Sequence, residues 1–486
     1  GFLDSKWYHL YCSVQRCNSA LRVLNAATDE QVNGRVSRIA EMKVLRAHYY
    51  FELSRLFNKI PYFDENVEIS QYPDIPNNEF TREEILSMLA KEMLDAAEQL
   101  PASQPEVGRI HKYIALAYAA KIKLYQAYQQ DEITHAVTSI NKELLREVVS
   151  LCDQVTASNR YGLLDDFQGL DLVTNENGKE SVFAIQYSMN DGTESAGRIN
   201  WSNLLNSPGG GSPYGGDGFF LPSQDLINAY QTDANGLPDF NYQSKSDYSW
   251  AVLNNGVYTL QNTTPNVDPR LDFVVGRPTI TWKTYPDKPC EGWVRDKDTY
   301  GYNCAKRFWV SPESSDMFNG WPWGASQLNW QIIRYADILL WKAEALIELN
   351  EGNGLETARD LINQIRNRAR NSAYVKDFND HSKYAANYLV NPYPADVWNQ
   401  DYARQALRWE TRLEKALEGE RFFDLVRWGI VETTMNKYIT AESDNRIYYA
   451  NAHFTGGKDE YYPVPNNQYG FSGGKYVQNP GYAPFN

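Results

Sequence analysis

Residues 331–370 read QIIRYADILLWKAEALIELNEGNGLETARDLINQIRNRAR. Apolar side chains recur with helical periodicity on both sides of a turn that contains Gly352 and Gly354. This pattern predicts two helices, over Gln331–Leu349 and Glu356–Arg370. Two helices of that length joined by a short turn form a helical hairpin of about 34 residues, the tetratricopeptide period. The stretch therefore predicts a fold built from helical repeats.

Further helices are predicted on both sides of this hairpin. Arg35–Phe57 carries apolar residues at spacings of three or four and is followed by Pro61, where a helix would stop. Thr81 with Glu84 three residues later is a capping box at the start of a helix. The other predicted helices are Glu83–Leu100, His111–Tyr128, Glu143–Val155, Tyr402–Glu418 and Glu420–Trp428.

The middle of the chain differs from both ends. It is rich in Gly, Pro, Asn and aromatic residues, with short strand-like runs at Ser181–Tyr187 and Leu271–Val275. Eight of the 13 Trp residues lie between positions 201 and 330. We therefore expect a mainly α fold in three parts: N-terminal helical repeats (1–160), a loop-rich, partly β, aromatic insert (161–330), and C-terminal helical repeats with a surface tail (331–486).

Composition and charge exclude several classes of protein. Hydrophobic residues make up 42% and charged residues 22% of the 486, as in ordinary globular proteins. There is no apolar run of roughly 18 residues that would span a membrane. The net charge is −14 and no block of Lys and Arg is present, so nucleic-acid binding is not expected. Neither a His-Glu-x-x-His motif nor a Gly-x-Ser-x-Gly elbow occurs, and we expect no metal or cofactor.

Several motifs together resemble the SusD/RagB family of outer-membrane nutrient-binding lipoproteins. Residues 45–51 (LRAHYYF) resemble the first helical repeat of that family, and residues 334–340 (RYADILL) with 362–369 (INQIRNRA) resemble the third. Residues 418–425 (EGERFFDL), followed by Arg-Trp-Gly, are similar to its most specific signature. The segments YPVP (462–465) and QNPGY (478–482) are similar to its C-terminal hallmark.

The resemblance implies a fold, a function and a partner. The implied fold is a SusD-like superhelix of tetratricopeptide-like hairpins, and the implied function is non-catalytic. The protein would capture a glycan at the outer surface of a Gram-negative bacterium and deliver it to a SusC-like, TonB-dependent transporter. The chain would be held at the outer membrane by an N-terminal lipid anchor that this sequence lacks. The alternatives are a peptide or glycoprotein receptor of the RagB type, a glycoside hydrolase that uses acids of the insert, and a protein-interaction scaffold.

A charged cluster near the C-terminal helices allows two interpretations. Paired carboxylates catalyse glycoside hydrolysis, but carboxylates and arginines at helical spacing also form ion-pair networks. We favour the network, because the cluster coincides with the scaffold signature of a non-catalytic family. Its members are Glu410, Arg412, Glu414, Glu418, Glu420, Arg421, Asp424 and Arg427.

The aromatic insert is the candidate binding region. Flat rings desolvate the apolar face of a sugar while neighbouring polar groups satisfy its hydroxyls. We expect at least two rings of this region to face a ligand. One further ring, Tyr72, lies in a polar loop after the first repeat, and the resemblance implies a contact there because the family also draws ligand contacts from that loop. The predicted ligand-binding residues are Tyr72, Trp282, Trp293, Tyr302, Trp309, Trp321 and Trp323.

Two further expectations concern cysteines and the N-terminus. Cys290 and Cys304 flank an aromatic loop, and either a disulfide between them or two buried thiols is consistent with the sequence. Family members place tens of residues between a Phe-Leu-Asp run and the first helix, whereas here Asp4 almost adjoins Trp7. The resemblance therefore implies that a flexible stretch between these two residues is missing from this sequence.

Overall fold

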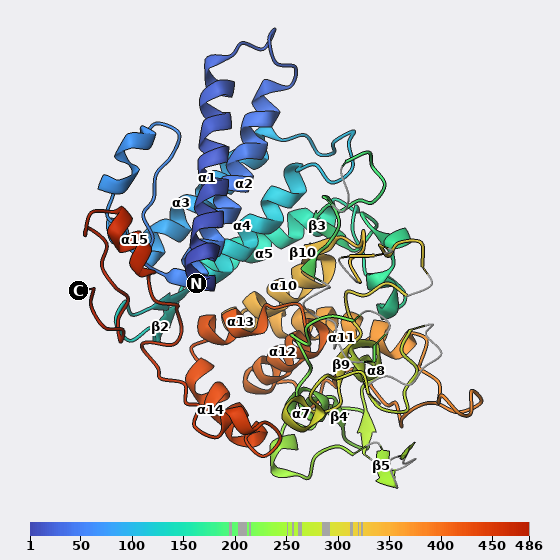
Figure 1. The fold of residues 1–486 in the computed structure, drawn as a ribbon. Helices are drawn as coiled ribbons and strands as arrows, with labels where there is room; N and C mark the ends of the chain where they lie inside the picture. Colours follow the sequence, from blue (N-terminus) through green and yellow to red (C-terminus); the bar gives the residue numbers. More distant parts are fainter. Residues whose placement is uncertain are drawn as a thin grey trace. The chain divides into compact units, whose positions relative to one another are not determined.

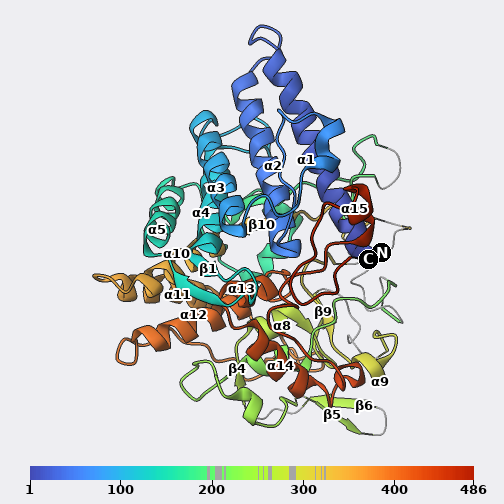
Figure 2. The same cartoon turned by 90° about the vertical axis from the view of Figure 1, so that its left-hand side faces the viewer.

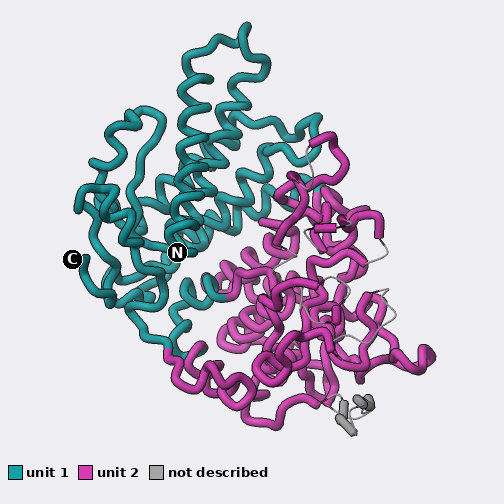
Figure 3. The backbone as a smooth tube through the Cα atoms, viewed as in Figure 1, with its two compact units in different colours: residues 1–160, 422–434, 454–486 teal, residues 161–421, 435–453 magenta. Residues whose placement is uncertain are grey.

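The structure is a computed structural model, and it is mainly helical, with 47% of residues in helices (Figure 1). It describes residues 1–193, 197–202, 211–212, 215–249, 251–254, 257–260, 265–283, 292–311, 314–318, 320–321 and 324–485. The chain forms two compact units (Figure 3): unit 1 contains residues 1–160, 422–434 and 454–486, and unit 2 contains residues 161–421 and 435–453. Among the described residues, no helix combines the length and the apolar character needed to span a bilayer.

Five helices follow one another in unit 1, and each packs against the next. In both views α1 and α2 lie side by side as a hairpin (Figures 1 and 2). The predicted bounds of α2 are confirmed, and those of α3, α4 and α5 are correct to within two residues. The helices are α1 (Phe2–Ala26), α2 (Arg35–Phe57), α3 (Arg82–Gln99), α4 (Lys112–Ala127) and α5 (Lys142–Ala157).

Local chemistry explains why α3 begins where it does. The Thr81 hydroxyl accepts a hydrogen bond from the Glu84 backbone N–H at 3.2 Å, and the Glu84 carboxylate accepts one from the Thr81 N–H at 2.8 Å. These bonds satisfy donors that a helix N-terminus leaves without intrahelical partners. The predicted capping box is therefore confirmed.

The C-terminal tail, expected on the surface, is partly buried against α2. The side chain of Asn479 is 2% exposed and donates to the carbonyl of Phe57 at 2.8 Å, while the Tyr462 N–H donates to the carbonyl of Leu56 at 2.8 Å. Both carbonyls belong to the last turn of α2, where a helix has no internal donors left. The tail therefore caps α2. Other elements of unit 1 are the 3₁₀ helix η1 (Ile69–Asp74), β1 (Tyr128–Gln130), β2 (Val137–Ile140), α13 (Arg421–Arg427), whose first residue belongs to unit 2, and α15 (Asn466–Phe471).

Three helices form the centre of unit 2: α10 (Tyr335–Leu349), α11 (Gly354–Asn371) and α12 (Gln400–Glu414). They pack on one another through a buried apolar cluster that includes Leu340 and Ile362. The helical hairpin predicted from residues 331–370 is confirmed.

The first helix of that hairpin starts later than predicted. Residues Trp330–Arg334 form strand β10, which pairs antiparallel with β3 (Ser181–Ile185). Two consecutive isoleucines in β10 favour an extended backbone because they are β-branched, and the hydrogen bonds to β3 decide the conformation.

The predicted strand at Leu271–Val275 is wrong, because Arg270–Val274 form the short helix α8. All five side chains of α8 are buried. A short apolar run that is buried all round has no periodicity to separate strand from helix. Pro269 precedes the helix, and the Asp268 carboxylate accepts from the Arg270 N–H at 3.0 Å, which fixes the first turn.

The other elements of unit 2 are short, apart from α14. The α-helices are α7 (Gln224–Ala229), α9 (Lys297–Tyr300) and α14 (Val431–Glu442), which begins in unit 1. The 3₁₀ helices are η2 (Phe167–Asp171), η3 (Val173–Asn175), η4 (Tyr242–Ser244) and η5 (Ile447–Tyr449). The paired strands are β4 (Gln231–Thr232) with β7 (Asn266–Val267), β5 (Ala251–Asn254) with β6 (Val257–Leu260), and β8 (Val275–Gly276) with β9 (Cys304–Ala305).

Candidate ligand-binding site

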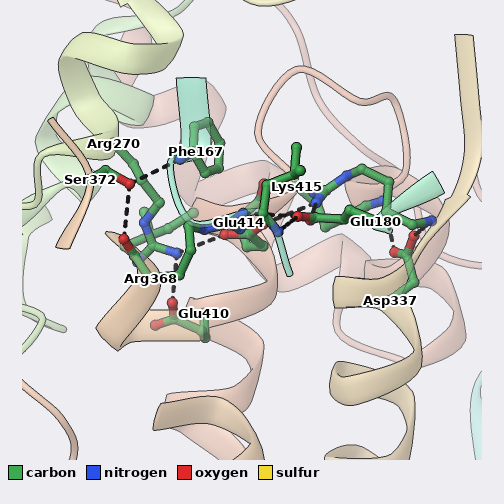
Figure 4. A network of polar contacts seen from close by, with 12 residues as sticks. Phe167, Glu180, Arg270, Asp337, Arg368, Ser372, Glu410, Glu414 and Lys415 are labelled. Atoms are coloured by element: carbon green, nitrogen blue, oxygen red, sulfur yellow. Dashed lines mark hydrogen bonds and ion pairs between the residues drawn. The ribbon is translucent and has the colours of Figure 1, made fainter. Parts of the chain in front are cut away.

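Three carboxylates of the charged cluster form an ion-pair network in the interior of unit 2 (Figure 4). Glu410 and Glu414 project from α12, Glu418 follows the helix, and all three are buried. Arg and Lys side chains from several elements surround them. The pairs are Glu410 with Arg270 (2.6 Å) and Arg366 (3.0 Å), Glu414 with Arg334 (3.1 Å) and Arg368, and Glu418 with Arg334 (2.7 Å), Lys415 (2.6 Å) and Arg307 (3.1 Å).

The surroundings of this network do not suit glycoside hydrolysis. Burial alone would raise the pKa of Glu414, but the guanidinium groups of Arg368 and Arg334 outweigh burial and lower that pKa to about 2. A catalytic acid needs the opposite, a raised pKa and contact with substrate. The interpretation as an ion-pair network is confirmed for Glu410, Glu414 and Glu418. Other members form separate pairs, Arg412 with Asp225 at 2.6 Å and Asp424 with Arg427 at 2.9 Å, the latter in unit 1.

Three of the seven predicted ligand-binding residues lie together in the core of unit 2. Trp282, Trp293 and Trp309 are at most 3% exposed, and the ring centroids of Trp282 and Trp293 lie 5.7 Å apart. The indole N–H of Trp282 donates to the Ala305 carbonyl at 3.2 Å. Gly276 allows this packing, because a Cβ there would lie 2.7 Å from the Trp282 ring. These rings therefore hold the insert together.

The other four predicted residues are scattered. Tyr72 is buried in unit 1, stacked on Phe63 at 3.8 Å. Tyr302 is half-buried against the tryptophan cluster, and Trp321 is 62% exposed. Trp323 lies outside the described residues, as does Cys290 with its predicted disulfide. A ligand-binding role for the seven residues stays a prediction.

A second group of rings lies at the surface of unit 2, and we call it the tyrosine patch: Tyr300, Tyr438, Tyr448 and Tyr449. Tyr448 links the group, with centroids 6.0 Å from Tyr300 and 4.6 Å from Tyr449. The hydroxyls of Tyr438 and Tyr449 are hydrogen-bonded at 3.2 Å. Tyr448 is 51% and Tyr300 42% exposed, so the patch presents aromatic surface to solvent.

Arg446 fixes the position of the patch. Its side chain is buried, and its guanidinium group would lie 2.7 Å from a Cβ on Gly301, the residue that follows Tyr300 with φ 71°. A glycine is therefore needed to bring the end of α9 onto this guanidinium group. The Arg446 N–H donates to the Glu442 carbonyl at the end of α14. The Glu442 carboxylate in turn accepts from the Asp225 N–H in the first turn of α7.

Polar groups are joined to the segment that carries the patch. Asn445, beside Arg446, donates to the exposed Asp247 carboxylate at 3.4 Å, and Asn228 donates to the same carboxylate at 2.7 Å. Aromatic rings beside amide and carboxylate groups match a sugar, which has an apolar C–H face and hydroxyls at its edge. Among the described residues, no group of three or more His, Cys, Asp or Glu is placed to hold a metal ion.

Three rings of the tyrosine patch lie outside the segments predicted to bind a ligand, which were residues 161–330 and one loop after the first repeat. Tyr438, Tyr448 and Tyr449 lie outside that segment, between the last long helical repeat and the tail. A signal was present: Ile447, Tyr448 and Tyr449 are consecutive in a polar stretch with no helical periodicity.

Comparisons with known proteins place these features in a family. A sequence model described as the SusD family matches residues 179–482, and a second model, described as starch-binding associating with outer membrane, matches residues 3–124. A SusD-like protein of Bacteroides ovatus is 22% identical over 447 residues, which cover 88% of this chain. The chain spans 65% of the length of that relative.

Solved structures show the same fold. A SusD homologue from Bacteroides thetaiotaomicron aligns with a TM-score of 0.70 at 18% identity, over 99% of this chain and 86% of that one. Surface glycan-binding protein A from the same species, solved in complex with laminarihexaose, aligns with a TM-score of 0.66 at 19% identity. That alignment covers 98% of this chain and 85% of the other.

Proposed function

Because this chain belongs to the SusD family, we propose that it captures a glycan at the outer surface of a Gram-negative bacterium. In this proposal a lipid-anchored protein holds the glycan at the outer membrane and passes it to a SusC-like, TonB-dependent transporter. The protein binds and does not cleave its ligand. The laminarihexaose complex of a relative with the same fold supports a glycan as the ligand.

The tyrosine patch is the observation that carries this proposal. Tyr300 and Tyr448 present ring surface to solvent, and Asn445, three residues before Tyr448, donates to the exposed Asp247, so unit 2 offers rings for stacking and polar groups for hydroxyls. Burying an apolar sugar face on such rings is favourable, while each hydroxyl exchanges water for a protein partner at little net gain. We therefore expect dissociation constants in the micromolar to millimolar range, about −8 to −4 kcal/mol.

Affinity electrophoresis of the purified protein through gels that contain single polysaccharides tests the binding step. Retardation by at least one polysaccharide, with no release of reducing ends from it, is the expected result. Release of reducing ends would establish the glycoside hydrolase instead. Retardation by none of a broad panel, together with binding of peptides or glycoproteins, would establish the RagB-type receptor.

Cross-linking in native outer membranes, followed by mild detergent extraction, tests the delivery step. We expect a complex with a TonB-dependent transporter encoded next to this protein. Isolation of the protein alone after cross-linking would contradict the partnership and leave glycan binding to the electrophoresis.

A further inference from the structure

Unit 1 contains a cleft of about 520 Å³ that the proposed function does not use. It lies between the loop that joins β1 to β2, the start of α14 and two stretches of the C-terminal tail. Its volume falls within the roughly 300–1,000 Å³ that small-molecule sites occupy in proteins. The cleft is therefore large enough for a monosaccharide or an amino-acid side chain with its backbone.

Glycine backbone forms much of the wall of this cleft. Gly429, Gly456, Gly457 and Gly481 all line it. A Cβ on Gly429 would lie 2.8 Å from Val137, one on Gly456 2.7 Å from the Glu432 carboxylate, and one on Gly481 2.5 Å from Lys458. The chain packs too closely at these three positions for a side chain, and the wall of the cleft there consists of backbone.

Two carboxylates and one imidazole supply the polar chemistry of the cleft. Glu432 accepts a hydrogen bond from the Gly456 N–H at 3.0 Å through one oxygen. Glu460 accepts from the Gly457 N–H at 3.1 Å through Oε1. Among the described residues, Glu460 Oε2 and His135 Nε2 have no hydrogen-bond partner, although Glu460 is only 6% and His135 only 3% exposed. A buried polar atom left in this state costs free energy that a bound donor would recover.

The charges and hydrogen-bonding capacity of the side chains that line the cleft determine which ligand charge fits. Burial lowers the pKa of His135 to about 4, so that its ring is neutral at pH 7 and can accept a hydrogen bond at Nε2. Within the part of the chain that the structure describes, no Lys or Arg lines the cleft. The side chains that line it offer acceptors and negative charge. A ligand must therefore bring donors and positive charge, and an ammonium group brings both, with three N–H donors.

We propose that this cleft binds an ammonium group, carried by a small molecule such as an amino sugar or by a lysine residue of a peptide. The ammonium group donates hydrogen bonds to Glu460 Oε2 and His135 Nε2, and its positive charge favours the ionised form of Glu460, whose pKa is otherwise raised by burial. The Glu432 carboxylate adds negative charge beside it. The aliphatic lining from Ile133 and Val431 packs on the carbon skeleton of the ligand.

Isothermal titration calorimetry with two matched pairs of probes at neutral pH tests the proposal. The first pair is D-glucosamine and N-acetyl-D-glucosamine, and the second is Nα-acetyl-lysine methylamide and its Nε-acetylated form. Acetylation removes the charge of each amine, leaves one N–H donor in place of three and adds a neutral acetyl group. We expect the free amines to bind about tenfold or more tightly than the acetylated forms. The tighter of the two amines identifies the source as sugar or peptide.

Variants place the binding in the cleft. Glu460→Gln keeps an oxygen for the Gly457 N–H and removes the charge, so we expect about a tenfold loss of amine affinity. Glu432→Gln tests the second carboxylate if the first variant does not fold. Glu98→Gln, at an exposed position of α3, is the matched control and should bind as the wild type does.

Two results would overturn the proposal. Equal affinity for the free and acetylated forms would show that the cleft does not recognise the ammonium group. Unchanged amine affinity in both folded carboxylate variants would place the amine elsewhere on the protein.

Discussion

Tyr448 is the residue at which glycan binding is most directly tested. About half of its surface is exposed and its neighbours Tyr300 and Tyr449 extend the aromatic face. Tyr448→Ala should cost about 1–3 kcal/mol of binding free energy, because one stacking ring is lost. In affinity electrophoresis this change should abolish visible retardation, while the melting temperature stays within about 2 °C of wild type.

Tyr8→Ala is the control for this change, because Tyr8 is a tyrosine on α1 with 59% exposure and no place in the patch. It should leave retardation unaltered. If Tyr448→Ala and Tyr300→Ala both bind glycan as before, the tyrosine patch is not the binding surface.

Trp282 and Trp321 belong to the same aromatic segment, but truncation to Ala should destabilise the protein strongly at Trp282 and hardly at all at Trp321. Trp282 is 1% exposed and packs in the tryptophan cluster, so Trp282→Ala should lower the free energy of unfolding by about 3–5 kcal/mol. Trp321 is 62% exposed, and Trp321→Ala should change that free energy by no more than about 0.5 kcal/mol. Chemical denaturation of the two variants checks both values, and similar losses in the two would contradict the burial described above.

These two tryptophans also show what the sequence leaves open about a binding site. The excess of Trp in residues 201–330 correctly marks this segment as unusual, but composition does not state which way a ring points. In a helix, periodicity separates the buried face from the exposed one. The segment around Trp282 has no such period, and its burial depends on packing against Cys304 and Trp309, which are distant in sequence.

At the scale of elements, long periodic helices were predictable and short ones were not. The helix over Arg35–Phe57 was predicted with its bounds because many turns repeat one apolar pattern. The short helix Arg270–Val274 was predicted as a strand because a single buried turn carries no period. The strand Trp330–Arg334 was merged with the helix that follows it, since its conformation depends on pairing with a strand about 150 residues earlier.

The helix α12 carries the carboxylates that neutralise the buried arginines, and removing one should destabilise unit 2. Glu414→Ala leaves Arg334 and Arg368 with an unbalanced buried charge, which should cost about 3–5 kcal/mol of unfolding free energy. Gln405→Ala, at an exposed position of the same helix, should change the free energy by less than about 0.5 kcal/mol. Urea denaturation measures both, and a loss below about 1 kcal/mol for Glu414→Ala would contradict a network of this kind.

At the scale of the whole molecule, the two compact units are built from segments that are far apart in the chain. Asn479 caps a helix that ends at Phe57, more than 400 residues earlier. A local sequence pattern predicts a helix end but does not identify the residue that satisfies its carbonyls. The motifs of the family supply the order of the repeats, whereas these long-range pairings become visible only in the folded chain.

The stability of the whole protein should depend on pH through Glu442 with an unusual sign. Burial raises the pKa of Glu442 from 4.5 to about 7 in the folded state. Between these two values the folded state holds a proton that the unfolded state has released, so stability falls as pH rises through this window and levels off above about pH 7. Glu414 acts in the other direction, because its pKa is lowered to about 2 and its contribution is lost only as pH falls below about 4.5.

Glu442→Gln isolates the first of these effects. The amide keeps an oxygen for the Asp225 N–H and does not titrate. The part of the stability loss between about pH 4.5 and 7 that Glu442 causes should therefore be absent in this variant. At pH 8 we expect it to be more stable than wild type by roughly 1–3 kcal/mol, whereas near pH 4 the two should agree. Thermal unfolding across this range measures the difference, and Glu98→Gln should follow the wild-type curve throughout. If the Glu442→Gln curve runs parallel to that of the wild type, Glu442 is already ionised in the folded protein over this pH range. The hydrogen bonds that join α7 through Glu442 to Arg446 and the tyrosine patch would then include a carboxylate that stays charged.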